Sequence, residues 1–378
     1  MVYKYLLTNN DKKRLDKLFY KLQHASRNYS GYPSSLNFDY SELFRFLSMN
    51  INNIGDPFAS SNYHVNTHEI EAEVIEFFAE LFGLRERHTG YVTNGGTEGN
   101  LYGLHIGSYY YPHGVVYYSE SSHYSIDKIM RIIGVKNIKI KQKINGEMDY
   151  DDLYVNLNKN RHVPAIFLVN IGTTMTGAID NLDIIKKYLH DLKIKDFYIH
   201  CDAALHGSFL PFVPDPPPFD FKAGIDSITL SGHKFIGSPI PCGIALVKYR
   251  YLKNLTPKIS YIQITDSTIS GSRNGMTPLF LWYAIKRFGI SGFQEMTERC
   301  LAIARILTQK MVALGIKAWQ NPYSNIVVFP CPSEKFVHKW QIATCDEIAH
   351  FIVMPHHSEE FFDHILKDLV SDIAFKKA

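Results

Sequence analysis

The sequence predicts an α/β protein built around a mostly parallel sheet, and three observations support this fold class. Short apolar runs bounded by turn residues recur between residues 115 and 247. Stretches with helical periodicity separate several of these runs, as at residues 123–134 and 180–192. Buried strands that alternate with helices are typical of βαβ units, whose strands are parallel. The 378 residues are also sufficient for one large domain and a smaller second one.

Two amphipathic helices are predicted before this alternating region. Residues 11–24 carry one apolar stripe at helical spacing. Residues 67–82 carry a stronger stripe, which Gly83 terminates. The apolar positions of the two stripes are Leu15, Leu18, Phe19 and Leu22, then Ile70, Val74, Phe77, Phe78 and Leu81.

Six apolar runs are predicted as strands. They are Val115–Tyr118, Ala165–Val169, Phe197–Ile199, Ser227–Leu230, Ile244–Val247 and Asn325–Phe329. A long helical region is expected from residue 274 to Met311, and an amphipathic helix near residues 358–375. This layout predicts three parts, namely an N-terminal arm at 1–55, a large α/β domain at 56–290 and a smaller C-terminal domain at 291–378.

Composition argues against several classes of protein. The formal net charge is only +3 and there is no long basic block, so nothing favours binding to nucleic acid or to an anionic membrane. No apolar run approaches the roughly 18 residues that span a bilayer, and the first residues lack the features of a signal peptide. The five cysteines are widely spaced without a CxxC pair, which predicts reduced thiols in a cytoplasmic protein.

The segment SGHK at residues 231–234 carries the strongest chemical signal. It follows the predicted strand Ser227–Leu230 and precedes a turn-rich stretch. An ammonium is costly to bury, so Lys234 at the end of a buried strand suits an amine that forms a Schiff base. By itself, however, a lysine in this position is more often a solvated strand end.

The loop Thr93–Asn100 is a candidate anion site. Gly95, Gly96 and Thr97 precede a stretch of helical pattern at residues 101–110. Backbone N–H groups at a glycine pair, together with the positive end of a helix dipole, can bind an anion. The segment is neither a P-loop nor a dinucleotide-binding fingerprint, and a plain tight turn is an equally good interpretation.

Polar residues follow three of the predicted strands. Asp202 lies where a carboxylate is nearly buried and needs a partner, such as a protonated pyridine nitrogen, although it could instead cap a helix. His123 could stack on an aromatic cofactor or transfer protons, although a packed or capping histidine is the commoner case. Asn170 could bind a phenolic oxygen, and turn chemistry explains it equally well.

These signals gain weight together, because all four sites lie at strand ends and are expected at one edge of one sheet. An anion cradle at residues 95–97, a stacking His123, a buried Asp202 and Lys234 match the requirements of pyridoxal phosphate. That cofactor needs a phosphate site, a ring contact, a carboxylate at its nitrogen and a lysine for a Schiff base.

The chain resembles the group II pyridoxal-phosphate decarboxylases, and within them the bacterial histidine decarboxylases. The similarity covers nearly the whole chain, and the SGHKxxGxPxPCG pattern is highly specific. The resemblance implies the aspartate-aminotransferase type of fold (fold type I). The matching segments are GYVTNGGTEGN at 90–100, NIGTTMTGAID at 170–180, HCDAAL at 200–205, SGHKFIGSPIPCG at 231–243, GSRNG at 271–275 and PYSNIVVFPCPSE at 322–334.

The resemblance implies a role for each matching residue. Lys234 would be the Schiff-base lysine, Asp202 would pair with the pyridinium nitrogen, and Ala204 would pack beneath the ring. His123 would stack on the other face of the ring and touch the substrate. The phosphate would be held by Gly95, Gly96 and Thr97, with help from Ser231 and His233.

Other positions are implied less directly. The loop Ser270–Arg273 would approach the cofactor of a partner subunit, which implies a homodimer or a dimer-based oligomer. Asn170 stands where many members of the family carry threonine, so its role stays open. The resemblance places three candidates near the substrate imidazole, which are Tyr63, His64 and Ser324.

The expected function is α-decarboxylation of an L-amino acid, with L-histidine and histamine as the first choice of substrate and product. A serine decarboxylase of the same family is the nearest alternative, and an aminotransferase or a binding protein on this scaffold is more distant. No metal is expected, because His68-Glu69 is not part of an HExxH motif and His356-His357 lacks a second pair of ligands.

Overall fold

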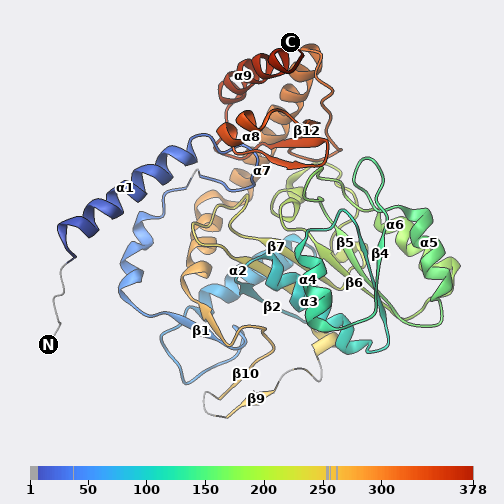
Figure 1. Cartoon of the computed structure of the whole chain (residues 1–378). Coiled ribbons are helices and arrows are strands. Elements are labelled where there is room, and N and C mark those ends of the chain that lie inside the picture. Colours follow the sequence, from blue (N-terminus) through green and yellow to red (C-terminus); the bar gives the residue numbers. More distant parts are fainter. Residues whose placement is uncertain (1–6, 37, 253–254, 256, 261–262, 378) are drawn as a thin grey trace.

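The computed structural model describes residues 7–36, 38–252, 255, 257–260 and 263–377. A central seven-stranded sheet carries helices on its faces, and a three-stranded sheet lies near the C-terminal helices (Figure 1). The central strands are β2 (His88–Thr93), β3 (Val115–Ser119), β4 (Asn137–Ile140), β5 (Ala165–Asn170), β6 (Phe197–Asp202), β7 (Ser227–Ser231) and β8 (Gly243–Lys248).

The central sheet has the order β2-β8-β7-β6-β5-β3-β4. The pairs from β7 to β4 are all parallel, whereas β8 is antiparallel to both of its neighbours. Helices α4 (Ser125–Ile133), α5 (Tyr150–Lys159) and α6 (Leu182–Asp191) connect the parallel strands. The α/β class and the mostly parallel sheet predicted from the sequence are therefore confirmed.

Helix α3 (Gly96–Tyr110) lies against the middle of this sheet, and glycines on one of its faces make the close approach possible. A methyl group on Gly103 would lie 2.2 Å from Nδ1 of His200 on β6. Similar groups on Gly99 and Gly107 would lie 2.4 Å from Thr229 and 2.6 Å from Tyr198. The helix therefore holds its N-terminus against the ends of β6 and β7.

Replacing Gly103 with alanine should destabilise the protein by about 1–3 kcal/mol, the usual cost of overpacking a core. The added methyl group would push the rigid His200 ring into the sheet. Urea denaturation measures the loss. Gly271→Ala is the matched control because no atom lies within 4 Å of that methyl position. Equal stability of the two variants would contradict the close packing of α3.

The N-terminal part of the chain runs along one side of the molecule (Figure 1). Helix α1 (Asn9–Ser26) has no buried residue, while the 3-10 helix η1 (Ser41–Ser48) and α2 (His68–Leu81) pack against α7. Strand β1 (Asn52–Ile54) pairs with β11 (Ser272–Asn274), and β9 (Lys258–Ile259) pairs antiparallel with β10 (Ile264–Thr265).

The long helix α7 (Met276–Ala313) bends at Gly289, whose φ of 57° and ψ of −172° lie outside the helical region. Beyond it, the small sheet has the order β12-β14-β13; its strand β12 packs against α7, and α9 packs against α7 and α8. These elements are β12 (Ile326–Pro330), α8 (Glu334–Trp340), β13 (Ala343–Cys345), β14 (Ile348–Ile352) and α9 (Glu359–Lys377).

The six predicted strands and the long C-terminal helices are confirmed in position. Helix α3 begins at Gly96 instead of residue 101, so part of the expected loop is the first turn of a helix. Among the described residues, no helix is both long and apolar enough to cross a membrane.

Candidate active site

The topology places all four predicted site segments at one edge of the central sheet. Strands β3, β5, β6 and β7 are parallel, and β2 runs the same way as β7 because each pairs antiparallel with β8. Gly95, His123 and Lys234 lie in the segments that follow β2, β3 and β7, and Asp202 is the last residue of β6. Ligands in open α/β sheets bind at this carboxyl edge.

Lys234 lies in the turn between β7 and β8. Its backbone carbonyl accepts a hydrogen bond of 3.1 Å from the N–H of Ser35, so the N-terminal arm contacts this turn. Burial lowers the pKa of the Lys234 amine, and the nearby Asp202 carboxylate opposes that shift. Because a lower pKa raises the fraction of neutral amine, Lys234 is suited to attack a carbonyl.

Asp202 is only 6% exposed, and both of its carboxylate oxygens accept hydrogen bonds. The N–H of Ala204 donates to Oδ1 at 3.1 Å, and the Nδ2 amide of Asn100 donates to Oδ2 at 2.7 Å. Within the described part of the chain, no lysine or arginine forms an ion pair with this carboxylate. A buried carboxylate without a cation suits a cationic ligand group.

The N-terminus of α3 is where the sequence predicts an anion site. Gly95 precedes the helix with φ 151° and ψ 172°, a conformation open essentially to glycine only, and it makes no side-chain cap. The first N–H groups of the helix are therefore free for a ligand. A methyl group on Gly96 would lie 2.8 Å from Oγ of Ser231 and 3.7 Å from Cβ of Ala204, so the cradle adjoins both residues.

The acidic side chain in the first turn of α3, Glu98, is fixed by hydrogen bonds to Asn94 and Tyr91. Glu98 accepts hydrogen bonds from the N–H of Asn94 at 3.1 Å and from its amide at 2.6 Å. Its other oxygen accepts a hydrogen bond of 2.9 Å from the Tyr91 hydroxyl. Thr97, the remaining predicted phosphate ligand, is exposed.

Two histidines adjoin Lys234. His123 is half-buried, its Nδ1 lies 2.8 Å from Oγ of Ser125, and burial lowers its pKa while Asp202 raises it. Nδ1 of His233 lies 2.8 Å from the backbone carbonyl oxygen of Cys242. Burial also lowers the pKa of His233.

Asn170 forms hydrogen bonds with a second buried carboxylate, that of Asp180. Its backbone N–H and its side-chain amide donate to Oδ2 of Asp180 at 2.8 and 2.9 Å. Asp180 is 1% exposed, and burial raises its pKa to about 6. Asn170 lies beside Asp202 in the register of β5 and β6, so it reaches the same edge with its amide group oriented by Asp180.

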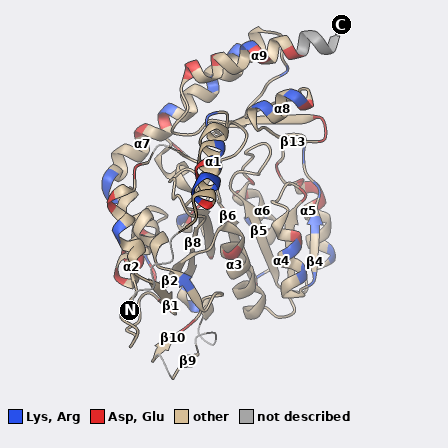
Figure 2. Ribbon diagram, turned by 60° about the vertical axis from the view of Figure 1, so that its left-hand side comes forward, with Lys and Arg blue, Asp and Glu red and all other residues tan. Residues whose placement is uncertain are grey.

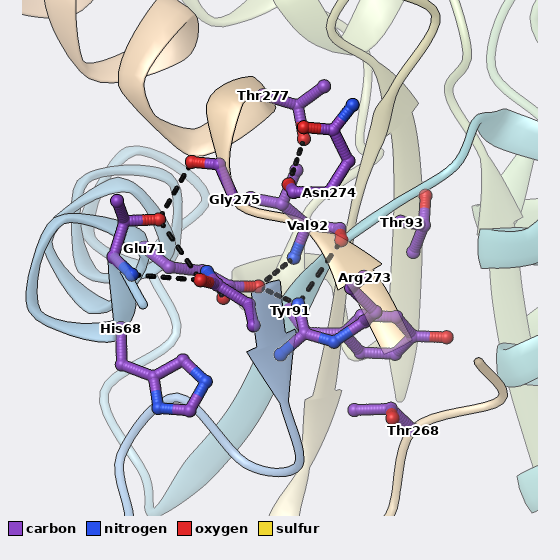
Figure 3. Close-up of polar contacts among 12 residues, drawn as sticks. His68, Glu71, Tyr91, Val92, Thr93, Thr268, Arg273, Asn274, Gly275 and Thr277 are labelled. Carbon is purple, nitrogen blue, oxygen red and sulfur yellow. Dashed lines mark hydrogen bonds and ion pairs between the residues drawn. The ribbon is translucent and has the colours of Figure 1, made fainter. Parts of the chain in front are cut away.

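A buried ion pair fixes the loop that was expected to approach a partner's cofactor (Figure 3). Arg273 of β11 pairs with Glu71 of α2, and the two side chains are 2% and 0% exposed. Arg273 also lies over the Tyr91 ring at 5.0 Å and donates to the carbonyl of Gly55 at 2.7 Å. Arg273 is therefore held within its own chain, and Gly271 and Ser272 remain exposed.

Replacing Arg273 with methionine should cost about 3–5 kcal/mol, because it leaves Glu71 buried without its cation. Urea denaturation at neutral pH measures this loss. Lys286→Met removes the exposed ion pair with Glu73 and should cost less than about 1 kcal/mol. If both variants lost the same small amount, the buried pair would not be what holds β11 in place.

In the described ranges, the structure shows no contact that joins the three candidates for recognition of the substrate imidazole, which are Tyr63, His64 and Ser324. Ser324 is fully buried, its Oγ accepts a hydrogen bond of 3.1 Å from the N–H of Ile326, and it packs against Gly177. His64 is exposed and lines a groove of about 700 Å³ beside η1 and α7. The backbone N–H of Tyr63 donates to Ser61 at 3.1 Å.

The partners of Asp202 were not predicted from the sequence. Asn100 contacts it from α3, and His200 on β6 contacts Asn100 in turn, with Nε2 and Oδ1 3.0 Å apart. His200 stands two residues before Asp202, which places both side chains on the same face of the strand. That spacing is the one signal in the sequence that could have indicated a link.

The arrangement fits pyridoxal phosphate on structural grounds. The uncapped helix N-terminus beside Ser231 offers donors for a phosphate, and the buried Asp202 offers a negative charge for a ring nitrogen. Lys234 offers an amine whose pKa is lowered. Gly96 and Ala204 carry little or no side chain, and both adjoin the helix N-terminus next to Ser231.

Comparison with known proteins agrees with this geometry. Residues 108–319 match the pyridoxal-dependent decarboxylase conserved domain. Histidine decarboxylase from Vibrio campbellii is 43% identical over 97% of this chain and 96% of its own length. The enzymes of that name from Mesorhizobium japonicum and Morganella morganii are 42% and 44% identical, over 96% and 97% of this chain and 99% and 98% of theirs.

Solved structures show the same fold. L-methionine decarboxylase from Streptomyces sp. 590 aligns with a TM-score of 0.90 and 25% identity over 97% of this chain and 95% of its own. Glutamate decarboxylase from Lactobacillus brevis aligns with a TM-score of 0.79 and 19% identity, over 99% and 94% of the two chains.

Proposed function

The chain belongs to the pyridoxal-dependent decarboxylase family, and from that premise we propose that it converts L-histidine to histamine and CO2. It is a pyridoxal-phosphate-dependent carboxy-lyase. The observation that carries the choice of histidine is the identity of 42–44% to histidine decarboxylases along nearly the whole chain. The methionine decarboxylase of similar fold is only 25% identical.

Pyridoxal phosphate, when bound, supplies an electron-accepting ring that stabilises the carbanion left when CO2 departs. We assign its phosphate to the N-terminus of α3, with Gly95, Gly96, Thr97, Ser231 and His233 around it. Asp202 would hold the ring nitrogen in its protonated form, because a buried anion favours a nearby cation. Ala204 and His123 would lie on the two faces of the ring.

The same residues account for the handling of protons and of substrate. Lys234, with its lowered pKa, would bind the cofactor covalently and yield its place to the amino group of the substrate. After CO2 leaves, Lys234 or His123, or a water that they hold, would donate a proton to the substrate Cα.

A comparison of substrates tests the proposal. The purified chain with added pyridoxal phosphate should release CO2 from L-histidine faster than from L-serine or L-methionine. Preference for serine would assign the chain to serine decarboxylation, the nearest alternative. Amino transfer to a keto acid without CO2 release would instead identify an aminotransferase.

We also propose a homodimer that works in the cytoplasm. Helix α1 projects from the rest of the chain (Figure 1), carries charged residues (Figure 2) and has no buried residue, so a second copy could cover its apolar side chains. These side chains are Leu15, Leu18, Phe19, Tyr20 and Leu22, between 50% and 66% exposed. Sedimentation of the wild type and of Leu18→Lys/Phe19→Lys tests this, and a wild-type monomer would contradict it.

The division of the chain at residues 55 and 290 is likewise a proposal. The bend of α7 at Gly289 supports a boundary there, because two helices meet at that residue. Limited proteolysis that yields fragments cut near these positions would agree with it.

A further inference from the structure

A series of hydrogen bonds between buried side chains leads from Asp202 away from the site, through α3 and into β6 and β7. Asp202 bonds to Asn100, Asn100 to His200, His200 to Ser227, and Ser227 to Tyr198, where the series ends. All five residues are at most 6% exposed. The successive donor–acceptor distances are 2.7, 3.0, 2.7 and 2.8 Å.

The direction of every hydrogen bond in this chain follows from Asp202. An ionised carboxylate can only accept, so the amide nitrogen of Asn100 faces it and the amide oxygen faces His200. The amide oxygen of Asn100 can only accept a hydrogen bond, so Nε2 of His200 carries the proton. Burial lowers the pKa of His200 to about 3, so the ring is neutral and its Nδ1 is a lone-pair acceptor.

The donor and acceptor of the remaining two hydrogen bonds are then determined. Nδ1 of His200 accepts from the hydroxyl of Ser227, and Oγ of Ser227 accepts from the hydroxyl of Tyr198. Every donor points toward Asp202, so the dipoles of four neutral groups add up at one carboxylate. Hydrogen bonds that run in series polarise one another, most strongly where water is excluded.

We propose that Asn100, His200, Ser227 and Tyr198 are positioning residues that orient the carboxylate of Asp202 toward the pyridine nitrogen of the cofactor. These four residues stabilise the carboxylate through dipoles alone. A lysine or arginine beside Asp202 would instead neutralise the negative charge that the ring nitrogen needs. The proposal rests on the role assigned to Asp202 above.

The packing of α3 supports this role. The His200 ring fits against Gly103, where a methyl group would lie 2.2 Å from Nδ1. Gly103 and Asn100 lie three residues apart, on the same side of the helix. The helix whose N-terminus forms the phosphate cradle therefore also orients the carboxylate at the other end of the ring.

The first test measures the tautomer of His200 in the cofactor-free protein. Selective 15N labelling of histidine, with His200→Gln to assign the signal, should show a proton on Nε2 and none on Nδ1 from pH 6 to pH 8. A proton on Nδ1, or on both nitrogens, would overturn the direction of the chain. This result does not depend on any substrate, so it stays separate from the choice of histidine.

The second test interrupts the chain at Ser227. Ser227→Ala should weaken binding of pyridoxal phosphate, measured by absorbance titration, about 3- to 10-fold, the value of one neutral hydrogen bond. Ser227→Thr keeps a hydroxyl and should recover most of the affinity. Thr297→Val, which removes a buried hydroxyl bonded to the carbonyl of Phe293 at 2.8 Å, is the matched control and should bind normally.

A double variant shows whether the effect passes through Asp202. In an Asp202→Asn background, Ser227→Ala should have no further effect on cofactor affinity, because no carboxylate remains to be oriented. An equal loss in both backgrounds would show that Ser227 has only a structural role and would overturn the proposal. Unchanged affinity in Asp202→Asn alone would instead refute the role of Asp202.

Discussion

Replacing Lys234 with alanine should abolish the visible absorbance of bound pyridoxal phosphate and lower kcat by on the order of 10³-fold or more, as loss of a covalent catalyst does. The absorbance arises from the Schiff base with a lysine, and Lys234 is the lysine at the sheet edge beside Asp202. Absorbance spectra and CO2 release from L-histidine measure the two effects.

A buried lysine elsewhere provides the control for this variant. Lys248 is 7% exposed, and its amine lies 3.5 Å from a carboxylate oxygen of Asp226 at the far end of β8. Lys248→Met should lose stability yet keep the visible band. Lys234→Arg keeps a cation but cannot form the Schiff base, so it should resemble Lys234→Ala. A visible band in either Lys234 variant would refute the assignment of this lysine.

The ends of the strands were the most predictable part of the site. Apolar runs locate buried strands, and a polar residue directly after such a run must lie at the edge of the sheet. Lys234, Asp202 and His123 were therefore found without knowledge of the fold, although their roles were implied by the resemblance. Strand β2 was missed because its sequence, HTGYVT, lacks a continuous apolar run.

The lateral contacts of these residues were not predictable. Asn100 meets Asp202, and Arg273 meets Glu71, across 102 and 202 positions of sequence. Neither pair leaves a periodic pattern, because periodicity reports burial within one element and not the partner of a side chain. Asn170 shows the same limit, since its link to Asp180 depends on a turn between β5 and α6.

Replacing Asp202 with asparagine should lower kcat by about 10²–10³-fold, the usual effect of removing one preorganised charge or donor from an active site. Asparagine has the same shape but no charge, so the ring nitrogen would no longer be held in its protonated form. The free energy of unfolding without cofactor should change little, because the weaker hydrogen bonds to an amide are offset by the lower cost of burying a neutral group.

Asp226 is the control, because its replacement should lower the free energy of unfolding and leave kcat unchanged. It is 2% exposed and bonds Arg250 at 3.0 Å and Tyr251 at 2.8 Å, far from the carboxyl edge of the sheet. Asp226→Asn should lower the free energy of unfolding while the enzyme that remains folded keeps its kcat. Urea denaturation and kcat are measured for both variants. If Asp202→Asn lost stability and kept its kcat, Asp202 would be a structural carboxylate like Asp226, and the ring nitrogen would need another anion.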